Sequence, residues 1–142
     1  MSYAVVRESR GVLVRWSGPI SGKAFLRSVH EINALPDFQL LRYVINDASG
    51  CPGIDLPGWI VEDAVAGAIG AHAANRKFVA AFVADQPAVA EAWATIARVA
   101  NDYLPVAAFG DLATARDWLA HLTRDGQPAA AASGTGFARR TP

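Results

Sequence analysis

The sequence predicts a single α/β domain in which four helices cover a mostly parallel, five-stranded sheet, in the order ββαβαβαβα. The chain of 142 residues, 52% of them hydrophobic, is long enough to bury one core. Two valine-rich segments, residues 3–8 and 12–17, roughly alternate in polarity and flank Ser9, Arg10 and Gly11, which is typical of a β-hairpin. After this hairpin, apolar segments alternate with segments of helical periodicity, and such alternation predicts parallel strands joined by right-handed crossovers.

The first helix is predicted to begin at Ser21 and to end before Pro36. A serine side chain can cap a helix, because its oxygen accepts a hydrogen bond from a backbone N–H of the first turn. A proline disfavours helical backbone in the residue before it, which places the end of the helix. The core side of this helix is predicted to consist of Phe25, Leu26, Val29 and Ile32.

The segment LRYVIN, residues 41–46, is predicted to be a buried strand that leads into a glycine-rich loop. A second helix is predicted to begin near Pro57 or Gly58. Its core side is predicted to consist of Val61, Val65, Ala68, Ile69 and His72.

The second half of the chain has the clearest patterns. Residues 77–84, KFVAAFVA, are apolar on both faces, which is typical of a central strand. Asp85 is predicted to cap the next helix, with Pro87 in its first turn. A short last strand at residues 105–109 precedes Asp111, which is predicted to cap the final helix. The predicted core residues are Val89, Trp93, Ile96, Ala100 and Tyr103 in the third helix and Leu112, Ala115, Trp118, Leu119 and Leu122 in the last one.

The domain is predicted to span residues 1–123, followed by a low-complexity tail at residues 124–142. This tail is rich in Ala, Gly, Pro and Ser and has no apolar periodicity.

Composition argues against nucleic acid and membranes as partners. The 13 basic and 13 acidic side chains cancel, so no global field attracts an anionic polymer or an anionic bilayer. The longest uncharged run in the middle of the chain, residues 64–75, is too short to cross a membrane. A lone cysteine and charged residues near the start of the chain predict a reducing, cytoplasmic location without a signal peptide.

The glycine-rich loop is the predicted site, because ligands of open parallel sheets bind beyond the carboxyl ends of the strands. A purely structural role is the alternative, in which the aspartates bind backbone amides and the glycines permit tight turns. A tryptophan at the mouth of the second helix could cover a small apolar pocket, anchor an interface, or pack against the sheet. The candidate residues are Asp47, Ser49, Cys51, Asp55 and Trp59.

Catalytic chemistry is not predicted for this loop. A nucleophilic Cys51 needs a nearby base, and the three histidines lie on separate segments. The chain lacks the H-x-x-x-H, H-E-x-x-H and C-x-x-C spacings of metal sites. We therefore expect no metal, no cofactor and no enzymatic activity.

The chain resembles the SpoIIAA-like family, which is related to STAS domains and by fold to the lipid-carrying SEC14 domains. The resemblance covers about residues 3–123. Its basis is the order of elements, a strand ending in IND at position 47, and the closing segment FGDLATARDWLAHL, in which Ala115, Trp118 and Leu119 follow the acidic cap Asp111 at A-x-x-W-L spacing.

The resemblance implies a module without enzymatic activity that binds another protein or another copy of itself. In STAS domains phosphorylation of a serine at the start of the second helix breaks such a contact. This chain departs from that pattern, because its D-A-S-G sequence at residues 47–50 comes directly after the strand. Ser49 is therefore only a candidate phosphorylation site. A homodimer could form through an edge strand bearing Tyr3 and Val5, or through Phe137, Arg139 and Arg140 of the tail.

A second hypothesis is a carrier or sensor of a small apolar ligand. It is based on Trp59, on the small residues of the second helix, and on the relationship to lipid-carrying folds. An enzyme that uses Asp47, Ser49 or Cys51 is the third alternative, and it requires polar groups that converge on the loop.

Overall fold

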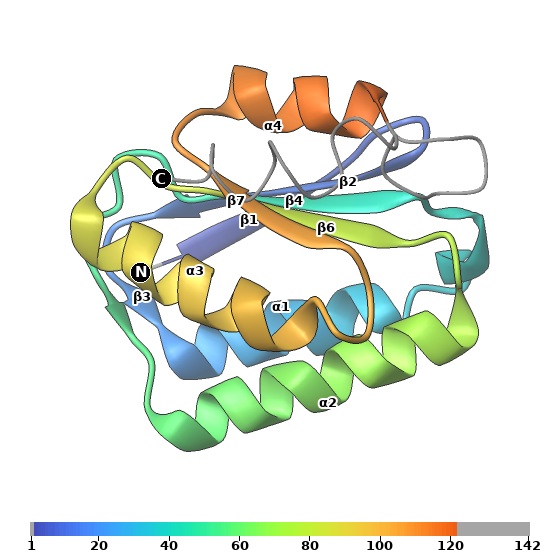
Figure 1. Ribbon diagram of the computed structural model, residues 1–142, viewed down its shortest axis with the longest axis horizontal. Helices are drawn as coiled ribbons and strands as arrows, with labels where there is room; N and C mark the ends of the chain where they lie inside the picture. The colour runs from blue at the N-terminus through green and yellow to red at the C-terminus, as the bar shows by residue number, and fades with distance from the viewer. Residues whose placement is uncertain (1, 122–142) are drawn as a thin grey trace.

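The computed structural model describes residues 2–121 and confirms the predicted α/β architecture. Its main sheet has five strands in the order β1-β2-β4-β6-β7 (Figure 1). The first two strands form the predicted antiparallel hairpin, and the other neighbours are parallel. The strands are β1 (Ser2–Arg7), β2 (Gly11–Ser17), β4 (Tyr43–Asp47), β6 (Val79–Val83) and β7 (Val106–Phe109).

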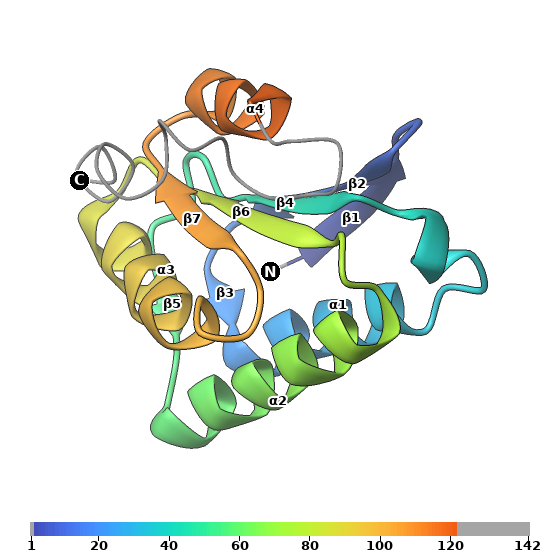
Figure 2. The ribbon, with the colours of Figure 1, turned by 45° about the vertical axis from the view of Figure 1, so that its right-hand side comes forward.

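Three helices cover one face of this sheet and one helix covers the other (Figure 1). The three are α1 (Gly22–Asn33), α2 (Gly58–Ala74) and α3 (Pro87–Ala100), and the single one is α4 (Leu112–Ala120). Helix α2 is the outermost of the three and packs mainly on α1 and α3, not on the sheet (Figure 2).

Two short features were not predicted. A 3-10 helix, η1 (Phe38–Leu40), precedes β4, so this strand begins at Tyr43 and not at residue 41. Strands β3 (Ile20–Ser21) and β5 (Ile54–Asp55) pair in parallel as a separate two-stranded sheet. This pair joins the start of α1 to the segment before α2.

The core lies on both faces of the sheet, as alternation along the strands requires. In β2, Val12, Val14 and Trp16 are buried toward the three helices. Leu13 is buried toward α4. Strand β6 is buried at all five positions, which confirms the prediction of a central strand.

The predicted helix caps at Ser21 and Asp111 are confirmed. Each side chain accepts a hydrogen bond from a backbone N–H of its own first turn: Ser21 Oγ from Ala24 at 3.0 Å and Asp111 Oδ1 from Thr114 at 2.7 Å. The predicted cap at Asp85 is wrong, because α3 begins one residue later with no side-chain cap.

The predicted core side of α2 is also wrong except at Ala68, which packs partly buried against the larger core. The buried residues of this helix are Ile60, Ala64 and Ala71, whereas Ile69 is 46% exposed. Apolar residues occur all around α2, so its pattern does not select one face. The prediction for α3 was right except at Tyr103, which follows the helix and is 41% exposed. Of the predicted inward residues of the last helix, Ala115 and Trp118 are buried, and Leu112 and Leu119 pack partly buried against the same core. The fifth, Leu122, lies outside the described residues, as does the predicted tail.

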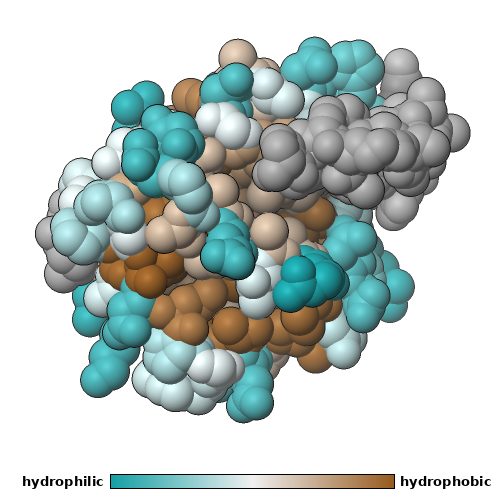
Figure 3. All heavy atoms as spheres, turned by 60° about the vertical axis from the view of Figure 1, so that its left-hand side comes forward, coloured by the Kyte–Doolittle hydropathy of each residue, from teal (hydrophilic) through white to brown (hydrophobic). Residues whose placement is uncertain are grey.

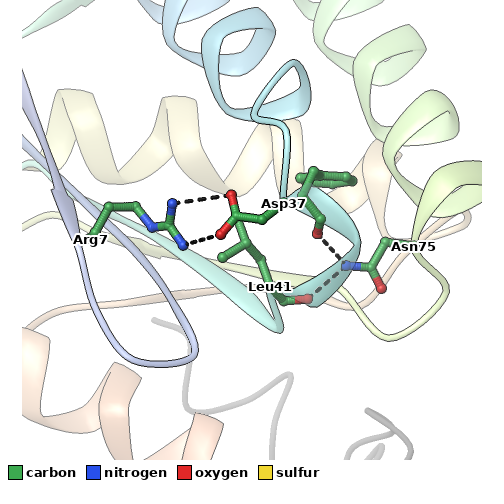
Figure 4. A network of polar contacts seen from close by, with 5 residues as sticks. Arg7, Asp37, Leu41 and Asn75 are labelled. Carbon is green, nitrogen blue, oxygen red and sulfur yellow. Dashed lines mark hydrogen bonds and ion pairs between the residues drawn. The ribbon is translucent and has the colours of Figure 1, made fainter.

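A network of polar contacts fastens the connection between α1 and β4 (Figure 4). The buried Asn75, just after α2, donates from Nδ2 to the carbonyl oxygens of Phe38 (2.9 Å) and Leu41 (2.6 Å). Two guanidinium nitrogens of Arg7 bind the two carboxylate oxygens of Asp37 at 3.2 and 2.7 Å. The ends of β1 and α2 are thereby tied to the same segment.

Strand β1 is an edge of the main sheet, as predicted. Tyr3 and Val5 pack partly buried against the core, and the Tyr3 hydroxyl donates to Glu31 at 2.8 Å. Within residues 2–121, no helix combines the length and apolar character needed to span a bilayer. The alternative dimer residues Phe137, Arg139 and Arg140 lie outside the described part of the chain.

Candidate functional site

The predicted loop follows β4 and is held by hydrogen bonds within itself and to Asp85. Oδ1 of Asp47 accepts hydrogen bonds from the backbone N–H of Ser49 (3.0 Å) and from its hydroxyl (2.6 Å). The next residue, Gly50, has a φ of 81°, a left-handed conformation that favours glycine. Its N–H donates to Oδ1 of Asp85 at 2.8 Å, so the carboxylate expected to cap α3 instead holds this loop.

Cys51 lies beneath the loop and is unsuited to nucleophilic catalysis. Cys51 is 1% exposed, and its backbone N–H donates to the carbonyl oxygen of Ala48 at 3.0 Å. Burial raises the pKa of the Cys51 thiol, and the carboxylates of Asp47 and Asp85 raise it further. A thiol that stays protonated is a weak nucleophile.

The other two predicted residues lie apart from this cluster. Asp55 is exposed in β5, and Trp59 is 49% exposed in the first turn of α2. No hydrogen bond of the described residues joins either of them to Asp47, Ser49 or Cys51. The structure thus brings three of the five predicted residues together. Residues 2–121 contain no group of three or more His, Cys, Asp or Glu side chains that could hold a metal ion.

The structure places a cavity elsewhere, between the central strands and the three helices of the larger core. Its volume is about 70 Å³, and its lining is almost wholly apolar. Of the predicted loop and its flanks, only Asn46 reaches it, and Trp59 does not line it. The lining residues are Phe25, Ser28, Val29, Ile32 and Asn33 of α1; Ala64, Gly67, Ala68 and Ala71 of α2; Val44, Asn46, Phe78, Ala80 and Phe82 of or beside β4 and β6; and Ile96, Ala100, Leu104 and Val106 of or beside α3 and β7.

Small side chains explain the space. Helix α2 contributes only alanine and glycine to the lining. Because α2 packs on α1 and α3, its distance from the sheet is too large for these small residues to fill. Ala80 in β6 and Ala100 in α3 leave further room on the opposite walls. A helix with larger side chains at these positions would fill the same space.

The more exposed part of the lining lies at the seam between α1 and α2. Its partly buried residues are Val29 and Asn33 of α1 and Gly67 and Ala68 of α2. Nδ2 of Asn33 donates to the carbonyl oxygen of Gly67 at 3.2 Å across this seam. A molecule entering here would pass beside that hydrogen bond.

Two buried polar side chains face the cavity from opposite walls. Asn46 of β4 is 5% exposed, and its Oδ1 accepts a hydrogen bond from the indole Nε1 of Trp16 at 3.1 Å. Ser28 of α1 is 1% exposed, and its hydroxyl donates to the carbonyl of Phe25 at 2.7 Å. Sequence reasoning missed Asn46 as a site residue. The available signal was its position two residues after Val44, in the core phase of a buried strand.

No protein-family model matches this chain, and no curated protein or solved structure is significantly similar to it. The function is therefore argued from the geometry of the site.

Proposed function

We propose that this domain binds a small apolar molecule, as a carrier or a sensor, in the cavity between α2 and the sheet. The observation that carries the proposal is an apolar space of about 70 Å³ in the larger core. The cavity opens at the surface, and a concave, mostly apolar pocket of this kind is the usual form of a small-molecule site. No residue with a formal charge lines this one within the described chain.

The volume limits the ligand. An engineered apolar cavity of roughly 150 Å³ holds benzene, whereas a single water needs only about 10–15 Å³. The present cavity, at about 70 Å³, lies between these limits. It suits a molecule of a few heavy atoms, or one end of a longer molecule that extends through the seam between α1 and α2.

The sequence resemblance to SEC14-related folds supports this proposal. The position of α2 supports it as well, because a helix that rests mainly on two other helices can shift without breaking the sheet. The loop at Asp47, Ser49 and Cys51 has no role in it beyond holding the end of β4.

A cavity-filling substitution tests the proposal. Ala68→Leu places a larger side chain into the lining, and Ala73→Leu adds the same side chain at an exposed position of the same helix. Titration with 2-methylpropene, a hydrocarbon of four heavy atoms, followed by backbone amide NMR shifts, should perturb cavity-lining residues in the wild type and in Ala73→Leu. Ala68→Leu should abolish these shifts while the fold stays intact. Wild-type spectra that do not change at the lining residues would refute binding in this cavity.

A second candidate function, binding of another protein or another copy of this chain, is favoured by the apolar surface on the helical side. Trp59 and Ile69 of α2, Val99 of α3 and the nearby Tyr103 are between 38% and 49% exposed. Figure 3 shows apolar side chains gathered in the lower half of the molecule, between polar ones. The resemblance to STAS domains agrees with this candidate, and Ser49 is exposed for modification.

Self-association is the form of this candidate that can be measured directly. Sedimentation velocity over a wide concentration range should show a dimer for the wild type and a monomer for Ile69→Lys. Ala73→Lys, at a small exposed position of the same helix, is the matched control for added charge and should remain dimeric. A wild type that stays monomeric throughout would exclude association between copies.

A further inference from the structure

The orientation of the Asn46 side chain is fixed by its neighbour. An indole nitrogen only donates hydrogen bonds, so the group facing Trp16 Nε1 must be the amide oxygen of Asn46. The amide nitrogen Nδ2 therefore points away from Trp16. Among residues 2–121 it donates no hydrogen bond, and it is not sealed from solvent, although Asn46 as a whole residue is only 5% exposed.

A ligand that filled the cavity would cover Nδ2 of Asn46, and a covered donor without an acceptor is unfavourable. Asn46 lines the cavity, so its two N–H groups are available to a molecule held there. The hydroxyl of Ser28, in the facing helix, already donates to Phe25 and has only lone pairs to offer. Asn33 uses Nδ2 on Gly67 at the seam. Asn46 Nδ2 is thus the one side-chain nitrogen of the described lining that donates no hydrogen bond within residues 2–121.

We infer that the cavity selects an uncharged, mostly apolar molecule that presents one hydrogen-bond acceptor, such as a ketone, ester or ether oxygen, to Nδ2 of Asn46. The inference rests on the proposed function and names the ligand class of that same site. A carboxylate is excluded by the absence of a cationic side chain among the described lining residues, because a buried charge without a partner is strongly unfavourable. A pure hydrocarbon leaves the Asn46 donor unpaired.

The test compares two ligands of four heavy atoms and nearly the same shape, acetone and 2-methylpropene, which differ in an oxygen against a methylene group. Substituting Asn46 alone would also remove the acceptor of Trp16. The comparison is therefore made between Trp16→Phe, which keeps the amide and has no indole donor, and the double variant Trp16→Phe with Asn46→Leu. Both proteins are first checked for a native fold by circular dichroism.

We expect the ratio of Kd for the ketone to Kd for the hydrocarbon to rise about tenfold in the double variant, because one hydrogen bond to the ligand is lost. In the wild type, the side-chain amide proton signals of Asn46 should move more on addition of acetone than on addition of 2-methylpropene. This second readout needs no substitution.

The outcomes separate the two proposals. An unchanged ratio, or Asn46 amide signals that ignore the ketone while the lining residues respond to both ligands, would overturn the role of Asn46 and leave binding in the cavity standing. No response of the lining residues to either ligand would overturn both.

Discussion

Two buried groups at the end of β4, the Cys51 thiol and the Asn46 amide, have contrasting surroundings. The thiol lies near two carboxylates that hydrogen-bond the loop above it, so its neighbours favour the protonated form. The amide lies against an apolar cavity with one donor unused. The surroundings of Cys51 thus disfavour the thiolate that nucleophilic chemistry would need. Asn46, which the sequence predicted only as the end of a strand, faces the cavity.

At this scale we predict that Cys51 is protected from modification. The native protein should react slowly with a thiol-specific aromatic disulfide, because the residue is 1% exposed and its raised pKa lowers the thiolate fraction. The reaction should accelerate as urea unfolds the protein. In the control, Cys51→Ser with Ser49→Cys, the only thiol lies at an exposed position of the same loop and should react rapidly. Equal rates for the two folded proteins would show that the loop opens freely.

At the scale of elements, α2 approaches α1 closely at Gly67. A Cβ added at Gly67 would lie 2.8 Å from Cγ1 of Val29, closer than carbon atoms approach each other. Gly70, one turn further along, has no atom within 4 Å of such a Cβ. Glycine thus has a packing role at the first position and none at the second.

A pair of glycine substitutions measures this contact. Gly70→Ala should stabilise the protein by about 0.5–1 kcal/mol, because alanine is the better helix former. Gly67→Ala gains the same helix propensity, but its Cβ crowds the stiff, branched side chain of Val29. This crowding should lower the free energy of unfolding by about 1–3 kcal/mol. We therefore expect Gly67→Ala to be the less stable of the two variants in urea unfolding.

A third variant identifies the cause. Combining Gly67→Ala with Val29→Ala should remove the clash, so the penalty of the glycine substitution should be smaller in the Val29→Ala background than in the wild type. The same penalty in both backgrounds would place the strain elsewhere than between α1 and α2.

At the scale of the whole molecule, contacts between distant segments close the second face of the sheet. The guanidinium of Arg116 in α4 binds both carboxylate oxygens of Glu8, at 3.1 and 2.8 Å, and the Tyr43 hydroxyl also donates to Glu8. Trp118 and Ala115 of α4 are buried against strands of the same face. These contacts join the hairpin, β4 and the last helix.

This cluster predicts how stability changes with pH. The guanidinium of Arg116, followed by the hydroxyl of Tyr43, holds the pKa of Glu8 below its ordinary value, although its own partial burial acts in the opposite direction. A carboxylate with a lowered pKa stabilises the folded state above its unfolded pKa, and this contribution is lost as the pH falls through the folded pKa. The free energy of unfolding should therefore fall on acidification.

Measuring urea unfolding at neutral pH and at about pH 3 checks the prediction. Glu8→Gln should lose less stability on acidification than the wild type, because glutamine does not titrate. Glu91→Gln is the control, at an exposed position of α3 where the carboxylate forms no ion pair within the described residues. If Glu8→Gln and the wild type lose the same stability, the carboxylate is not held in its charged form by α4.

Local chemistry in the sequence determined the class of fold, the order of its elements and the caps at Ser21 and Asp111, because each of these depends on residues a few positions apart. Only the tertiary structure decided the partner of Asp85, the buried side of α2 and the cavity. Asp85 had a suitable position for a cap, but its partner Gly50 is 35 residues away. The cavity likewise needs three helices and three strands at fixed distances, and the unused donor of Asn46 follows from Trp16, which lies 30 residues earlier. No local pattern encodes such distances, because they are set by how segments remote in the chain pack together.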